Sequence, residues 1–65
     1  MPYFYHNSKI YWNLSSFCRD NDLIYEGVRY FARKFGTKDL FMKHLHENNE
    51  VIDLLIQRYK KKEQP

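Results

Sequence analysis

Cysteine, glycine and proline are all scarce in this sequence, and each scarcity excludes a class of protein. The single cysteine, Cys18, cannot form a disulfide within the chain, so a disulfide-stapled secreted domain is excluded. Two glycines and two prolines are too few for a low-complexity or disordered chain. No apolar run approaches the roughly 18 residues of a membrane span, and Met1-Pro2-Tyr3 lacks the character of a targeting segment. We therefore expect a folded protein of the reducing cytoplasm that does not bind membranes.

Aromatic residues, by contrast, are abundant and make up 18% of the 65 residues. A chain this short buries only about 60% of its unfolded surface, so bulky aromatic side chains help to build its core. The sequence predicts one mainly α domain over residues 1–65. Its expected parts are a β-hairpin at 3–12, a helix-turn-helix at 13–35, one or two helices within 38–61, and a frayed tail at 62–65.

The hairpin and the first helix boundaries are indicated by local residue types. Aromatic and β-branched triplets at 3–5 and 10–12 flank a short polar loop, which is typical of a β-hairpin. Asn13 is a good N-cap, and Asp22 tolerates the left-handed conformation of a tight turn. Gly27 lies inside the second helix, where a small residue would let the two helices of the helix-turn-helix approach closely.

The second predicted helix has two faces of different chemistry. Its apolar face, at helical spacing, comprises Ile24, Val28, Phe31, Ala32 and Phe35. The opposite face carries Tyr25, Arg29, Tyr30, Arg33 and Lys34. Interleaved aromatic and basic side chains backed by a buried stripe are what a helix in the major groove of DNA requires.

The segment 17–23, Phe-Cys-Arg-Asp-Asn-Asp-Leu, followed by Tyr25 and Val28, resembles the helix-turn-helix pattern of small phage and mobile-element DNA-binding proteins. The hairpin sequence at 5–12 and Gly-Thr-Lys-Asp-Leu at 36–40 are also similar to that family. The resemblance covers about residues 4–45. The chain departs from the pattern at Asn21, where an apolar residue is usual, and at Asp22, where glycine is usual. The resemblance implies a transcriptional regulator or accessory factor that binds a specific DNA sequence.

Positive charge is concentrated around the same helix. Between Leu23 and His46 the chain has five basic residues and two acidic ones, within a net charge of +3. We predict that DNA is contacted by Tyr25, Glu26, Arg29, Tyr30, Arg33, Lys34, Lys38 and Lys43. Arg29 or Arg33 suits a bidentate pair with guanine, and Glu26 can accept from cytosine, whereas the lysines suit phosphates. The alternative is a solvated or protein-contacting basic face.

The last third of the chain, 38–61, is apolar on more than one face. Gly36 and Thr37 are expected to end the second helix and to cap the next one, and Asn48-Asn49 either breaks 38–61 into two helices or bends it. The apolar surface is either wrapped by the rest of the chain or holds a second subunit. The predicted homodimer interface is Val51, Ile52, Leu55, Ile56 and Tyr59.

Metal binding and catalysis are both disfavoured. Cys18, His6, His44 and His46 are the soft ligands, and none of their spacings is that of a zinc site. We see no phosphate-binding loop, nucleophile motif or paired catalytic carboxylates, so we expect no enzyme and no cofactor. The main rival to double-stranded DNA as the partner is a host or defence protein, inhibited through the Tyr and Arg face. A third hypothesis is a viral or plasmid assembly protein that uses Val51–Tyr59 as its interface.

Overall fold

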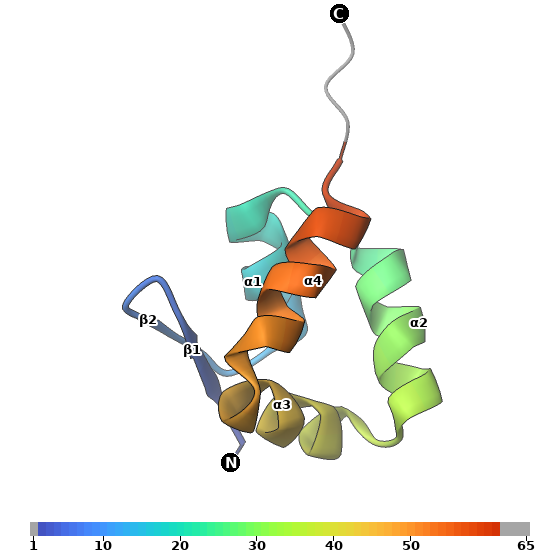
Figure 1. The fold of residues 1–65 in the computed structure, drawn as a ribbon. Coiled ribbons are helices and arrows are strands. Elements are labelled where there is room, and N and C mark those ends of the chain that lie inside the picture. The colour runs from blue at the N-terminus through green and yellow to red at the C-terminus, as the bar shows by residue number, and fades with distance from the viewer. Residues whose placement is uncertain (1, 62–65) are drawn as a thin grey trace, which may run out of the picture.

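The computed structural model describes residues 2–61 and shows a hairpin followed by four helices (Figure 1). The elements are β1 (Phe4–His6), β2 (Lys9–Tyr11), α1 (Leu14–Asn21), α2 (Tyr25–Phe35), α3 (Lys38–Glu47) and α4 (Asn49–Tyr59). The predicted mainly α fold with an N-terminal hairpin is therefore confirmed, and the segment after α2 forms two helices. The tail predicted at 62–65 lies outside the described residues.

The hairpin turn is tighter than the four-residue loop that the sequence predicted. His6 pairs with Lys9 at the end of the antiparallel ladder, so only Asn7 and Ser8 form the turn. Both have positive φ, at 50° and 63°, which is the geometry that matches the twist of two-residue hairpins. At the end of the ladder opposite the turn, Phe4 pairs with Tyr11, and both side chains are buried.

The predicted helix boundaries are confirmed by their hydrogen bonds. The Asn13 side chain accepts a hydrogen bond of 2.8 Å from the Ser16 amide and so begins α1. Asp22 ends α1 in the left-handed conformation, with φ 56° and ψ 51°. Thr37 caps α3 in the same way as Asn13 caps α1, by accepting from the Leu40 amide at 3.2 Å. These local signals therefore fix where α1 ends and where α1 and α3 begin.

The turn between α1 and α2 is held by the end of α4, which lies beside it (Figure 1). The Ile24 amide donates to the Tyr59 carbonyl at 2.8 Å, and the Lys61 amide donates to the Asp22 carbonyl at 2.9 Å. These bonds flank Leu23, whose side chain is buried in the core. The position of α2 therefore depends on α4 as well as on its own turn.

Gly27 allows a close helix contact, but with α4 and not with α1 as the sequence predicted. A Cβ atom placed on Gly27 would lie 2.6 Å from Cε1 of Tyr59, well inside normal contact distance. The aromatic ring of α4 thus lies directly on the backbone of α2 at this point. The residue lies within a regular helix, so the neighbouring ring, and not an unusual backbone conformation, is what favours glycine here.

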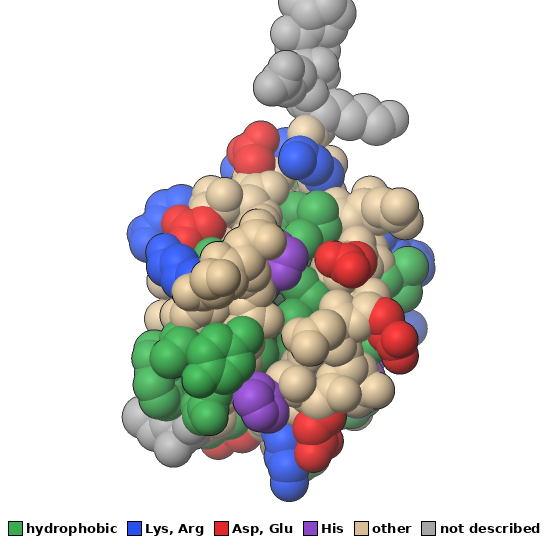
Figure 2. Space-filling model, turned by 60° about the vertical axis from the view of Figure 1, so that its left-hand side comes forward, with side chains coloured by type: hydrophobic (Ala, Val, Ile, Leu, Met, Phe, Trp, Pro, Cys, Tyr) green, Lys and Arg blue, Asp and Glu red, His purple; other side chains and the backbone are tan. Residues whose placement is uncertain are grey.

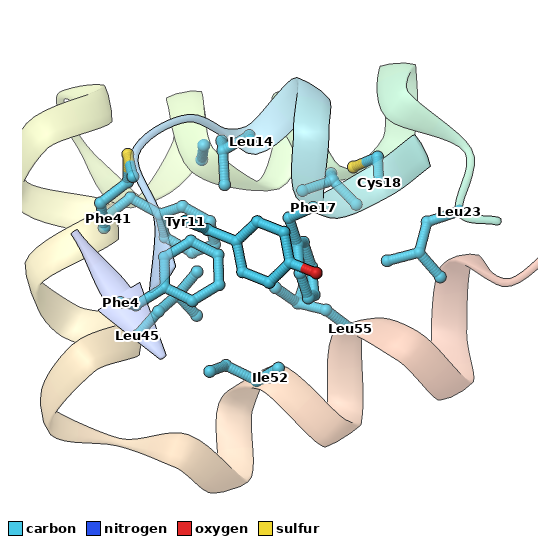
Figure 3. Packing of buried hydrophobic residues seen from close by; sticks show 13 residues of the cluster. Phe4, Tyr11, Leu14, Phe17, Cys18, Leu23, Phe41, Leu45, Ile52 and Leu55 are labelled. Atoms are coloured by element: carbon cyan, nitrogen blue, oxygen red, sulfur yellow. The ribbon is translucent and has the colours of Figure 1, made fainter. Parts of the chain in front are cut away.

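The core is formed by side chains from the hairpin, the turn and all four helices (Figure 3). Phe17 of α1 lies edge-on to Phe4 and Tyr11, with ring centroids 5.1 and 5.5 Å apart. Phe41 and Leu45 of α3 are also fully buried. Packing the hairpin on the helices in this way gives the short two-stranded sheet the support that it needs.

The predicted dimer interface on α4 is corrected by the structure. Ile52 and Leu55 are each 1% exposed and point into the core beside the aromatic rings (Figure 3). Val51, Ile56 and Tyr59 are partly buried and pack against the same core. These five residues of α4 therefore pack against this chain, as in the first of the two alternatives open from the sequence, whereas Leu54 on the same helix is 50% exposed. None of the described helices is long and apolar enough to cross a bilayer.

Candidate nucleic-acid interface

The buried stripe of α2 is narrower than the sequence predicted. Val28 and Ala32 are buried, and Phe31 packs against the core. Ile24 and Phe35, which were expected in the same stripe, are each 46% exposed. Ile24 is the N-cap of α2 and Phe35 is its last residue. Phe35 instead packs its ring on His44 of α3, with centroids 4.6 Å apart.

The outward face of α2 carries all six residues that the sequence placed there as DNA contacts. Each of these side chains is exposed: Tyr25, Glu26, Arg29, Tyr30, Arg33 and Lys34. Figure 1 shows α2 along one edge of the molecule, with α1, α3 and α4 on its other side. The helix can therefore meet a large partner along its whole length.

Half of the predicted DNA contacts meet in one shallow groove beside α2. Tyr25, Arg29 and Arg33 follow one another at intervals of four residues and form one ridge along the helix. Together with Lys38, the first residue of α3, they line a groove whose other lining residues are Leu14, Ala32 and Gly36. Three cationic side chains thus converge on this groove, and none of its lining residues is acidic.

Glu26, Tyr30 and Lys34 lie outside this groove on the open side of α2. Tyr30 is the most exposed of the aromatic side chains, at 60%. The Lys34 ammonium lies 5.2 Å from the centre of its ring, a distance that allows a cation–π contact. The open side therefore presents a carboxylate acceptor beside a phenol and an ammonium group.

Lys43, the remaining predicted DNA contact, is separated from the others. It is exposed on α3 between two further hollows. One hollow is lined by Phe35, Leu40, His44 and Glu47, and the other extends to Tyr3 of the hairpin. The structure therefore does not bring Lys43 into the groove with Arg29, Arg33 and Lys38.

Asp20 of α1 fastens the hairpin to the helices, a role that the sequence analysis missed. Its Oδ2 atom accepts hydrogen bonds from the Lys9 ammonium and, at 3.0 Å, from the Tyr11 hydroxyl. The bond from Lys9 and then that from Tyr11 lower the pKa of Asp20, and the same carboxylate raises the pKa of Lys9. Burial, followed by the bond to Asp20, raises the pKa of Tyr11. Lys9 and Asp20 are 11 residues apart, so no local pattern indicates this contact.

Cys18 is a core residue. Its side chain is buried on the inner face of α1, and this burial raises the pKa of the thiol to about 11. The thiol is therefore protonated at neutral pH and shielded from solvent, which makes it a poor nucleophile. Across residues 2–61, no three His, Cys, Asp or Glu side chains are grouped so that they could hold a metal ion.

A second cluster, which we call the aromatic surface, consists of half-buried Tyr3 with the exposed residues Tyr5 and Trp12 of the hairpin region and His46 and Leu40 of α3. The Tyr3 ring lies 5.1 Å from both Trp12 and His46 and 5.5 Å from Tyr5. Trp12 is 54% exposed and Leu40 56%. Figure 2, which brings the hairpin side forward, shows hydrophobic side chains gathered beside a histidine.

The aromatic surface was missed, although a signal for it exists in the sequence. Successive residues of a strand point to opposite faces of a sheet. Burial of Phe4 and Tyr11 therefore turns Tyr5 and Ile10 outwards, and Tyr3 and Trp12 continue the outward set. In each aromatic triplet, 3–5 and 10–12, the middle residue is therefore buried and the two flanking residues face outwards.

Comparison of the chain with known protein families, with curated proteins and with solved structures found no match.

Proposed function

We propose that this protein binds double-stranded DNA through the outward face of α2 and recognises a specific base sequence. The proposal is supported chiefly by one observation: a helix at the edge of the molecule presents two tyrosines, two arginines, a lysine and a glutamate to solvent. Such a face combines donors and acceptors for base edges with cations for phosphates. As the resemblance implies, the protein acts as a phage- or mobile-element-type transcriptional regulator or accessory factor in the cytoplasm.

The dimensions of α2 agree with this proposal. An α-helix with its side chains is about 10–12 Å across, which fits a major groove about 12 Å wide. The 11 residues of α2 give it a length of about 16 Å. Along the DNA axis this length spans about five base pairs at 3.4 Å each. One copy of the protein therefore recognises a short site.

The experiment is to select duplexes from a random library and to measure their affinity at low and moderate salt. We compare wild type with Arg29→Ala/Arg33→Ala. The matched control is Arg58→Ala/Lys60→Ala, which removes the same charge from the end of α4. The proposal predicts a recovered site whose binding is lost in the α2 variant and kept in the control. Equal binding by both variants, or no binding by wild type, contradicts it.

A second function is favoured by the aromatic surface, which is distinct from the groove beside α2. Trp and Tyr are enriched at the energetic centres of protein interfaces, and here Trp12 and Tyr3 pack together at the surface. The charged residues that line the neighbouring hollow, Asp39 and Lys43, are of opposite sign. A single nucleic-acid strand requires a cationic track, so this surface better fits an apolar side chain of another protein. In this case the chain inhibits a host or defence protein.

The second function has its own test. The three proteins wild type, Trp12→Ala and Arg29→Ala/Arg33→Ala are used as baits in the host cell. A protein target of the aromatic surface is retained by wild type and by the arginine variant, and is lost with Trp12→Ala. A target lost with the arginine variant instead contradicts the assignment to this surface.

A further inference from the structure

The groove beside α2 and the open side of the same helix differ in shape and in hydrogen-bonding chemistry. The groove is recessed between α2, the start of α1 at Leu14 and the start of α3 at Lys38. Glu26 and Tyr30 do not line it and face solvent on the open side. Duplex DNA has the complementary relief, because phosphates stand at the rims of the grooves and base edges lie on their floors. The recessed groove beside α2 therefore fits the phosphate rim of a DNA groove, and the protruding open side of α2 fits the base edges on its floor.

The chemistry of the groove matches phosphates better than bases. Arginine and lysine side chains carry donors and no acceptors, and phosphate oxygens are acceptors only. Arg29, Arg33 and Lys38 therefore offer only hydrogen-bond donors to a ligand in the groove. Tyr25 adds a hydroxyl donor. Base edges present donors as well as acceptors, so their recognition needs acceptors too. Glu26 and the hydroxyl of Tyr30 supply these acceptors on the open side.

From this difference we infer that Arg29, Arg33 and Lys38 form a seat for the phosphates of one DNA backbone stretch, and that Glu26 and Tyr30 recognise the bases. The inference rests on the proposed DNA binding and reverses part of the expectation from sequence, in which Arg29 or Arg33 pairs with guanine. Tyr25, the first residue of α2, lines the same groove and would donate its hydroxyl to the same backbone.

The number of cations in the seat sets the contribution of the seat to the salt dependence of binding. Neutralising one phosphate contributes a slope of about −0.9 to the logarithm of affinity against the logarithm of salt concentration. Three cations that each neutralise one phosphate give a slope of about −2.7, so a fourfold rise in salt weakens binding about 40-fold. Loss of one cation reduces that factor to about 12-fold.

The test compares Arg33→Gln with Glu26→Gln, two exposed positions of α2 where glutamine keeps the helix propensity. Both are measured on the selected site and on single-base variants of it, over a range of salt. We expect Arg33→Gln to flatten the slope by about 0.9 and to weaken all duplexes by the same factor. We expect Glu26→Gln to keep the slope and to change the preference at one base pair. The converse result, a changed base preference with an unchanged slope for Arg33→Gln, overturns the inference.

Duplexes with single uncharged methylphosphonate linkages provide the second readout. At one or two linkages the neutral group should weaken wild type but leave Arg33→Gln unaffected, because the contact is already lost. If every linkage weakens both proteins equally, Arg33 holds no phosphate and the inference fails while DNA binding stands. If wild type binds no duplex, the proposed function itself fails, so the two failures are distinguishable.

Discussion

Replacing Gly27 by alanine tests the contact between α2 and α4 that positions the proposed DNA-binding helix. Two effects of opposite sign are expected. Alanine is favoured over glycine inside a helix by about 1 kcal/mol. The new methyl group would lie 2.6 Å from Cε1 of Tyr59, and such overpacking typically costs about 1–3 kcal/mol. The free energy of unfolding should therefore fall by about 0–2 kcal/mol.

The two effects are separated by repeating the substitution in a Tyr59→Ala background. Without the ring, the overpacking cost disappears and Gly27→Ala should stabilise the protein by about 1 kcal/mol. The coupling between the two sites is then the overpacking cost itself, about 1–3 kcal/mol. Urea denaturation of the four proteins measures it. The same effect of Gly27→Ala in both backgrounds would refute the contact, and with it the account of how α4 holds α2.

Further predictions concern the core and the hairpin. Leu55→Ala, at a buried position, should lower the free energy of unfolding by about 2–5 kcal/mol. Leu54→Ala, at an exposed position, should change it by less than about 0.5 kcal/mol. Urea denaturation should give the same values at all protein concentrations. Because contacts with Lys9 and Tyr11 lower the pKa of Asp20, its stabilising contribution is present above the ordinary value of about 4 and is lost as the pH falls through the lowered one. Asp20→Asn should therefore reduce the loss of stability between pH 7 and pH 3, and an unchanged acid dependence would contradict this role. Cys18, buried with a pKa of about 11, should react with a thiol reagent only as fast as the protein opens, and fast labelling of the native state would contradict its burial.

Features that are set by a local signal could be predicted from the sequence. Asn13 and Thr37 cap their helices through residues three positions away, so the cap and its partner are both visible in a short window of sequence. The left-handed conformation of Asp22 follows from its own side chain. The exposure of Arg29 and Arg33 follows from the period of α2, whose opposite face is apolar.

Roles that depend on partners distant in the sequence could not be predicted from it. The apolar period of α4 correctly indicates a buried face, but it does not say whether Ile52 and Leu55 meet this chain or a second copy. Gly27 signals a close approach without naming Tyr59, which lies on another helix. The division of the predicted DNA contacts also depends on α1 and α3, because they enclose one side of α2 and leave Glu26 and Tyr30 outside.

The most direct measurement is amide chemical-shift mapping of the protein during titration with a selected duplex. The account predicts the largest shifts in α2, at Tyr25–Phe35, and at Lys38, with small changes at Tyr5 and Trp12 of the hairpin region. A titration that shifts the hairpin and α3 while α2 stays unchanged, or one that shifts no residue, would contradict DNA binding by α2.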